Sequence, residues 1–168
     1  MANAETAKRI YEIFNACPKF KIFTTGETFT FGDIEIHPFS IPHDTVDPVA
    51  FTLTVDKLKV GVCTDLGFAT TLVQTHLQKC DYLYLEANHE PSMVHSCSRP
   101  RPNKERTLGK NGHLSNEACG SLLAHVMHPK LQHIHLAHLS QECNSPETAL
   151  KVVQEKIGME TKISIAPQ

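Results

Sequence analysis

Apolar residues in this chain fall into short runs, and the order of these runs restricts the fold. One pair of runs flanks Gly32-Asp33, and a second pair, residues 50–55 and 58–63, flanks Asp56-Lys57. A polar pair between two strand-like runs predicts a β-hairpin in each case. Beyond these hairpins, apolar stretches with helical spacing alternate with short apolar runs typical of buried strands. The sequence therefore predicts an α/β fold in which helices cover one face of a sheet.

Further helices and strands are expected at definite positions. The helical segments are residues 4–14, 70–77, 115–127 and 146–157. The additional strands are residues 82–85, 131–136 and 162–165. Ser115 is a favourable N-cap, and Pro146 suits the first turn of a helix. Residues 96–112 show neither pattern, and we expect irregular structure there.

Length and composition are those of a single soluble domain. The chain has 168 residues, of which 40% are hydrophobic and 20% charged. A net charge of −2 provides no global field toward nucleic acid or an anionic membrane, so any basic surface must be local. Charged residues interrupt the N-terminal region where a signal peptide would be apolar, and no run of about 18 apolar residues exists. We expect a cytoplasmic protein that has no membrane partner.

The cysteines are scattered along the chain and form no CxxC pair. They are Cys17, Cys63, Cys80, Cys97, Cys119 and Cys143. We interpret them as reduced thiols of a cytoplasmic protein, and a disulfide framework is the alternative.

Histidine is the most unusual component of the composition, with 11 copies. Histidine is the commonest metal ligand and a frequent acid–base group. Four segments place such polar groups directly after an apolar run: His43-Asp44, Thr64-Asp65, residues 86–90 and His138. Polar groups that cluster at strand ends are a common way to build a functional site.

Asp65 has two interpretations. A carboxylate at the end of a buried strand costs free energy unless a metal or another cation compensates it, which favours a metal ligand. An N-cap of the following helix is the alternative.

The remaining histidines lack a partner motif. His133 and His135 alternate with apolar residues, so we expect them to face away from His138 and to be structural. A solvated or capping role is expected for His37, His76, His95, His125 and His128.

Five motifs together resemble a known family. FSIPHDTVDPVAF, GVCTDLG, YLYLEANHE, NGHLSN and LAHLSQECNSPETA occur in this order between about Lys8 and Ile157. The series is similar to the YycJ/WalJ-like branch of metallo-β-lactamase-fold hydrolases and, more distantly, to RNase Z. The resemblance implies an αββα sandwich, of which this chain would contain the C-terminal sheet and its helices. It also implies metal-dependent hydrolysis of phosphodiesters in nucleic acid, with a 5′-exonuclease-type action as the narrower expectation.

The resemblance also implies metal ligands. His43 corresponds to a ligand of the first metal, Asp65 to the carboxylate that bridges two metals, and His138 to a ligand of the second. Two zinc ions are the expected cofactor, and manganese is the alternative. Two cations about 3.5–4 Å apart polarise phosphoryl oxygens and generate a hydroxide nucleophile.

Three further residues are implied in catalysis. His113 corresponds to a histidine that contacts the scissile phosphate or assists the leaving group without binding metal. Glu86 and His89 lie near it in the motif order, and we group them with His113 as catalytic candidates.

The chain departs from the family pattern in two places. It contains no His-x-His-x-Asp-His motif, which the family places upstream and which supplies further ligands. We therefore expect residues 1–168 to be one incomplete domain that is inactive alone and that forms a homodimer through an exposed sheet face. The family also carries a second asparagine before Asn144, where this chain has Cys143.

A basic segment precedes the NGHLSN motif. We assign substrate binding to Arg99, Arg101, Lys104 and Arg106, because arginine suits bidentate contacts to phosphate. A merely solvated loop is the alternative. For the whole chain, the alternatives to a nuclease are a hydrolase of small esters, thioesters or lactams, and a catalytically inactive remnant that acts as a binding or oligomerisation module.

Overall fold

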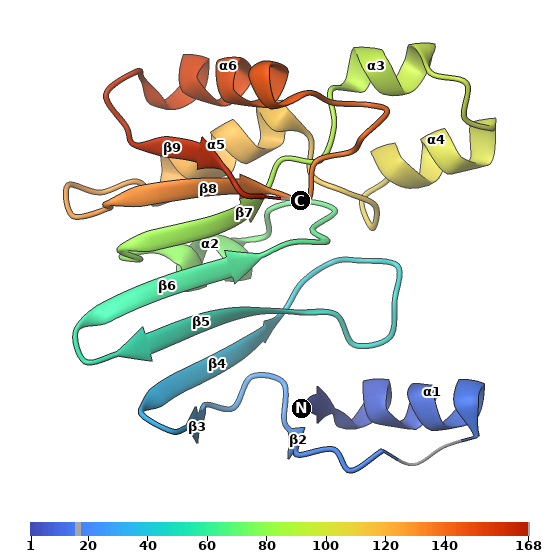
Figure 1. Cartoon of the computed structure of the whole chain (residues 1–168), viewed down its shortest axis with the longest axis vertical. Coiled ribbons are helices and arrows are strands. Elements are labelled where there is room, and N and C mark those ends of the chain that lie inside the picture. Colours follow the sequence, from blue (N-terminus) through green and yellow to red (C-terminus); the bar gives the residue numbers. More distant parts are fainter. Residues whose placement is uncertain (16–17, 168) are drawn as a thin grey trace.

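A seven-stranded sheet forms the centre of the computed structural model, which describes residues 1–15 and 18–167. Its strands lie side by side in chain order (Figure 1). They are β3 (Phe29–Phe31), β4 (Ile34–Ser40), β5 (Val49–Val55), β6 (Leu58–Cys63), β7 (Tyr82–Glu86), β8 (His133–Ala137) and β9 (Ile163–Ile165). Pairing is antiparallel from β3 to β6 and parallel from β6 to β9. Both predicted hairpins are confirmed, since β3 pairs with β4 and β5 with β6.

Helices cover one face of this sheet. They are α2 (Thr71–Leu77), α5 (Asn116–Val126) and α6 (Pro146–Ile157). In Figure 1, α2 and α5 lie behind the sheet, and α6 packs against α5. Each of these helices lies in a connection between two parallel strands, and crossovers of one hand place their helices on the same side. The predicted α/β fold with one covered face is confirmed.

Side-chain caps fix where the predicted helices begin. The Ser115 hydroxyl accepts a hydrogen bond from the Ala118 N–H at 3.2 Å, and the Thr70 hydroxyl accepts one from the Val73 N–H at the same distance. These bonds satisfy backbone donors that the first helical turn leaves unpaired.

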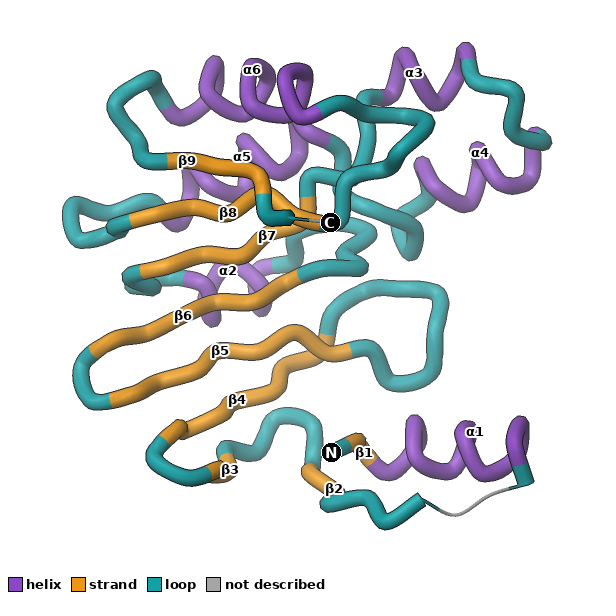
Figure 2. Tube along the Cα trace, viewed as in Figure 1, coloured by secondary structure: helices purple, strands orange, loops and turns teal. Residues whose placement is uncertain are grey.

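The irregular structure expected for residues 96–112 is wrong. α4 (Arg101–Leu108) lies within this region, and α3 (Pro91–Ser96) ends at its start; both lie beyond the sheet in Figure 2. α4 is polar along nearly its whole length, so it lacks the apolar spacing on which the prediction depended. An ion pair between Arg101 and Glu105 and a proline in the first turn favour the helix instead.

The N-terminal segment packs at the β4 side of the molecule. α1 (Ala4–Phe14) follows β1 (Ala2–Asn3), which pairs in parallel with β2 (Ile22–Phe23). The Asn3 amide donates to the Asp47 carbonyl at 2.8 Å, which ties this segment to the loop between β4 and β5.

The other face of the sheet has no helical cover in Figure 1. Leu83 and Leu85 in β7 are fully buried beneath the helices, whereas the alternate residues Tyr82 and Tyr84 are only half-buried. On the neighbouring strand, His133 and His135 stack on each other, and each contacts the Ser164 hydroxyl of β9. These contacts agree with the structural role predicted for this histidine pair.

Among the described residues, no helix is long and apolar enough to cross a membrane. The five cysteines in the described part of the chain are free thiols, and Cys17 lies outside it.

Candidate metal centre

The candidate site lies at the edge of the sheet where four strands end. β4, β6, β7 and β8 run in one direction, because β5 is antiparallel to both of its neighbours. His43 and Asp65 follow β4 and β6, Glu86 ends β7, and His138 follows β8. His113 comes from the segment that leads into α5. The structure thus gathers these five predicted residues into one cluster.

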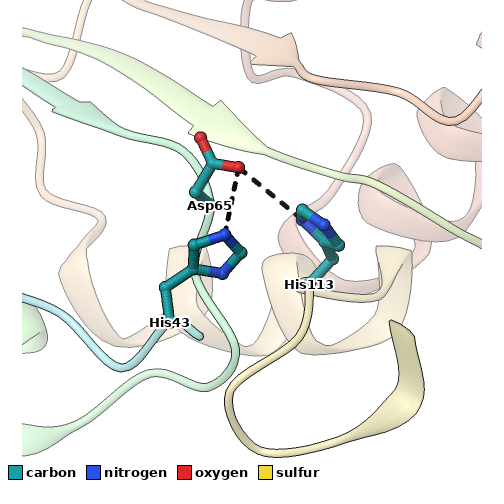
Figure 3. Close-up of side chains that lie close together, drawn as sticks. All are labelled: His43, Asp65 and His113. Atoms are coloured by element: carbon teal, nitrogen blue, oxygen red, sulfur yellow. Dashed lines mark ion pairs between the residues drawn. The ribbon is translucent and has the colours of Figure 1, made fainter. Parts of the chain in front are cut away.

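Asp65 lies at the centre of the three imidazoles. Its Oδ1 is 3.6 Å from His43 Nε2, 3.8 Å from His138 Nδ1 and 4.0 Å from His113 Nδ1. Figure 3 shows the carboxylate between His43 and His113. The 3.6 Å between Asp65 Oδ1 and His43 Nε2 exceeds a hydrogen-bond length, but it suits two ligand atoms that are each about 2 Å from a common ion.

The tautomer of His43 follows from its hydrogen bond. Its Nδ1 is 2.9 Å from the carbonyl oxygen of Gly112. Because a carbonyl can only accept, Nδ1 carries the proton and Nε2 of the neutral ring keeps its lone pair. His43 therefore has the tautomer that a metal-binding Nε2 requires.

His113 and His138 share one carboxylate. Their Nδ1 atoms lie 2.7 Å and 2.8 Å from Glu86 Oε1. An ionised Glu86 accepts from both rings, so both neutral histidines also leave Nε2 free. Carboxylate or carbonyl partners behind the ring are characteristic of metal-binding histidines. His, Asp and Glu donors in this geometry thus fit a divalent cation.

The charge of Glu86 is stabilised although the residue is fully buried. Burial alone would raise the pKa of its carboxyl group, but hydrogen bonds from His113, from His138 and from the backbone N–H of Leu66 lower that pKa below its usual value. The hydrogen bond between His138 and Glu86 also raises the pKa of His138, whereas desolvation lowers it. Glu86 therefore lies behind the histidines and orients them, and it does not line the cavity.

Two site residues have unusual backbone conformations. Asp65 and His138 both have a φ of 56°, in the left-handed region. Such residues cost of order 1–3 kcal/mol and cluster at functional sites. The N-cap alternative for Asp65 is wrong, because Thr70 caps α2. Asp65 is also half-exposed, with 45% of its side chain accessible, so the buried carboxylate at this site is Glu86.

His89 lies outside the cluster. The residue is 1% exposed, and its Nδ1 has no hydrogen-bond partner among the described residues. Burial, together with the nearby His113, lowers the pKa of His89 to about 4, and Glu86 opposes this shift. The ring therefore stays neutral near pH 7.

An open cavity of about 830 Å³ adjoins the cluster. Two of the four basic residues assigned to substrate binding, Arg99 and Arg106, line it. Arg99 pairs with Glu142 at 2.6 Å, and Arg106 pairs with Asp44. Arg101 and Lys104 are not among its lining residues: Arg101 pairs with Glu105, and Lys104 donates to the His95 carbonyl.

Asn88 is a site residue that the sequence did not single out. Its amide donates to the His138 carbonyl at 2.7 Å, and its own carbonyl accepts from the Ser140 N–H at 2.8 Å. Asn88 thereby fixes the strained backbone at His138. Its place in the EANHE motif was visible, but no sequence pattern distinguishes a loop-fixing asparagine from a solvated one.

Comparison with known proteins places this geometry in a fold family, although no protein-family model matches the chain. Among solved structures, the metallo-β-lactamase fold protein YhfI from Bacillus subtilis superimposes with a TM-score of 0.72 at 14% identity, over 98% of this chain and 60% of that one. The chain has the metallo-β-lactamase fold. A diphosphatase from the PhnP family shares this fold with a TM-score of 0.63 at 15% identity, over 98% of this chain and 53% of that one.

Curated sequences narrow the resemblance within the metallo-β-lactamase fold. The chain is 31% identical over 157 residues to exodeoxyribonuclease YycJ of Bacillus anthracis. The aligned region covers 92% of this chain and 59% of that protein. It is 34% identical over 128 residues to exodeoxyribonuclease WalJ of Streptococcus pneumoniae, over 76% of this chain and 48% of that protein. The chain thus spans less than two thirds of these homologues. The predicted resemblance to the YycJ/WalJ branch is confirmed.

Proposed function

We propose that this site belongs to a metal-dependent hydrolase that cleaves phosphodiesters of DNA, with a 5′-exonuclease-type action. The observation that carries the proposal is the common state of three histidines around Asp65. Each ring donates its Nδ1–H to a fixed acceptor, either the Gly112 carbonyl or the Glu86 carboxylate, and keeps a lone pair on Nε2. The exodeoxyribonuclease homologues supply the substrate class.

The residues divide into ligands and a proton donor. His43, Asp65 and His138 would hold the ions, with Asp65 as the bridge. Bound divalent ions would polarise the phosphate and activate water. While Glu86 accepts from its Nδ1–H, His113 would act on the leaving oxygen through Nε2, by donating the proton that Nε2 takes up during the reaction.

Arg99 and Arg106 would contact the substrate phosphates from the cavity rim. Both are already paired with carboxylates, Glu142 and Asp44, in the absence of substrate. A phosphate therefore has to compete with these ion pairs, which keeps the contribution of each arginine modest.

Metal binding is the first test. Zinc and manganese are titrated calorimetrically into the chain and into its Asp65→Asn variant, with Glu117→Gln on the outer surface of α5 as the control. We expect the unmodified chain and the control to bind both ions weakly, and Asp65→Asn to lose binding. A chain that binds neither ion contradicts the metal centre and favours the inactive remnant.

Substrate preference is the second test. The substrates are linear DNA with a 5′-phosphate, circular single-stranded DNA, RNA and a small ester, each with and without metal. We expect metal-dependent release of nucleotides from the 5′ end of linear DNA only. Ester hydrolysis without DNA cleavage would favour the small-ester alternative.

Zinc as the native metal, a cytoplasmic location and a homodimer through the uncovered sheet face are further parts of this proposal. One solved neighbour, PqqB from Methylobacterium extorquens, is zinc-bound and shares the fold with a TM-score of 0.58 at 13% identity, over 87% of this chain and 52% of that one. Zinc commonly takes histidine and carboxylate ligands, and these are the donors that the candidate site offers.

A further inference from the structure

Asp44 is a second carboxylate beside His43. It follows His43 directly after β4, and its Oδ1 is 3.5 Å from His43 Nε2, against 3.6 Å for Asp65 Oδ1. The Asp44 backbone N–H donates to the Asn111 carbonyl at 2.9 Å, which fixes the chain at this point. In the proposed hydrolysis Asp44 serves only as the partner of Arg106.

The atoms that meet at the outer edge of the His43 ring all carry lone pairs. The ring donates its Nδ1–H to the Gly112 carbonyl, so Nε2 of the neutral ring has no proton for either carboxylate. Two carboxylate oxygens close to a nitrogen lone pair are repelled by it unless a cation lies among them. The arrangement therefore favours a bound cation at His43 Nε2.

The distances fit a metal ion better than a proton. A charge-assisted hydrogen bond from a protonated ring would bring nitrogen and oxygen to about 2.7–2.9 Å. Two ligand atoms that are each about 2.0–2.2 Å from a tetrahedral ion lie roughly 3.3–3.6 Å apart. The separations of 3.5 Å and 3.6 Å from His43 Nε2 to the oxygens of Asp44 and Asp65 fall in the second range.

The number of ligands also leaves room for Asp44. In the proposed centre, the ion at His43 has only that ring and the bridging Asp65 as protein ligands. A catalytic zinc usually has three. Asp44 offers a carboxylate oxygen at nearly the same distance from His43 Nε2 as Asp65, so it can complete the set.

Arg106 competes for the same carboxylate. Its guanidinium donates from Nε to Asp44 Oδ2 and from Nη2 to Asp44 Oδ1, the latter at 2.9 Å. Both oxygens of Asp44 are thus engaged, so the carboxylate must leave the guanidinium before it binds an ion. The side chains of Arg106 and Asp44 are 62% and 31% exposed. Because an ion pair in contact with water contributes little to stability, an ion at His43 can draw the carboxylate away.

On the basis of the proposed metal centre, we propose that Asp44 is the third protein ligand of the ion at His43. Its carboxylate turns from Arg106 to this ion, and the released guanidinium binds a substrate phosphate in the cavity that Arg106 lines. The ion and the phosphate therefore strengthen each other's binding, because each removes one partner from the same ion pair.

Calorimetric titration of the full chain with zinc tests this role. Asp44→Asn keeps the shape of the side chain and removes its charge. We expect its affinity for zinc to fall by at least about 10-fold, since even a residue that only orients a ligand contributes that much. Arg106→Gln releases the carboxylate, so it should bind zinc more tightly than the parent chain. A misfolded variant would lose affinity, so the opposite signs exclude misfolding as the common cause.

Matched controls come from the second ion pair at the cavity, Arg99 with Glu142, which does not involve a candidate ligand. Glu142→Gln and Arg99→Gln remove the same charges as the test variants and should bind zinc like the parent chain. The double variant Asp44→Asn/Arg106→Gln should bind as weakly as Asp44→Asn alone, because without the carboxylate the arginine has nothing to withhold from the ion.

The outcomes separate this ligand from the metal centre itself. Unchanged affinity in Asp44→Asn, with zinc still bound by the parent chain, would overturn the assignment of Asp44 and leave the proposed centre intact. Additive effects in the double variant would also overturn it, because they would show that the two charges act independently through space. A parent chain that binds no zinc would overturn both proposals.

Discussion

At the scale of single residues, one buried carboxylate organises much of the candidate site. Glu86 receives hydrogen bonds from two imidazoles and from the backbone N–H groups of Leu66 and Leu114. An ionised group in an apolar interior is stable only when such partners replace its hydration. The same bonds set the ring orientation and tautomer of His113 and His138.

Glu86→Gln should weaken metal binding. The amide has only one acceptor oxygen, so its NH₂ group must face donors that the carboxylate formerly accepted from. Loss of such a partner behind a ligand lowers metal affinity by about 10–100-fold, as zinc titration would measure. The exposed Glu117→Gln variant should bind like the parent chain. Unchanged affinity in Glu86→Gln would show that the histidines hold their orientation without it.

His89 should make stability depend on pH. Its pKa is about 4 in the folded chain against 6.5 ordinarily, so the unfolded state binds more protons between these values. The free energy of unfolding should therefore be highest above pH 6.5 and fall as the pH drops toward 4, by at most about 1.4 kcal/mol per pH unit.

Urea unfolding at several pH values would measure this dependence. The parent chain should lose stability relative to His89→Leu as the pH is lowered, because the variant has no ring to protonate. His95→Gln in α3 provides a control at an exposed histidine and should follow the parent chain. A parallel pH dependence of the parent chain and His89→Leu would contradict the assignment.

At the scale of elements, α4 and the turn after it shape the site from outside the sheet. Arg106 in α4 reaches Asp44, and the Gly112 carbonyl just beyond the helix fixes the ring of His43. His113 follows in the next position. A helix that sequence periodicity does not indicate thus determines where two site histidines lie.

Gly112→Ala should disturb this arrangement. A Cβ at position 112 would collide with the carbonyl oxygens of Arg106 and Thr107 at the end of α4. Backbone must shift to accommodate it, so we expect a loss of about 1–3 kcal/mol in the free energy of unfolding and weaker zinc binding through His43. At Gly109 the atom nearest to an added Cβ would be 3.1 Å away, so Gly109→Ala should cost less. Equal effects of the two variants in urea unfolding and zinc titration would contradict this explanation.

At the scale of the whole molecule, the sheet is protected on one face only. Leu83 and Leu85 are buried beneath the helices, while Val60, Val62 and Tyr84 line an apolar depression on the opposite face. Contiguous apolar surface of this kind favours association.

The chain should self-associate through this face. Light scattering of the purified chain should show a mass that increases with concentration, and Val60→Lys should reduce the increase by placing a charge in the contact. Leu72→Lys is the matched control, because Leu72 is 47% exposed and lies on α2, on the helical side of the sheet. A parent chain that stays monomeric at high concentration would contradict the prediction.

The sequence by itself determined the elements whose signals are local. Hairpins around Gly32-Asp33 and Asp56-Lys57, the cap at Ser115 and the helix starting at Pro146 depend on neighbouring residues, and all are present. The resemblance of five motifs to a known family predicted the fold family, and the polar groups at strand ends predicted a site at one edge of the sheet.

Only the tertiary structure decided how these residues act on one another. Glu86 and His138 are 52 positions apart, so no local pattern predicts that they meet. The same holds for α4, whose polar sequence has no apolar period and which the ion pair of Arg106 with Asp44 links to the loop after β4. Burial, hydrogen-bond partners and tautomers arise from contacts across the sheet edge, and these are properties of the folded chain.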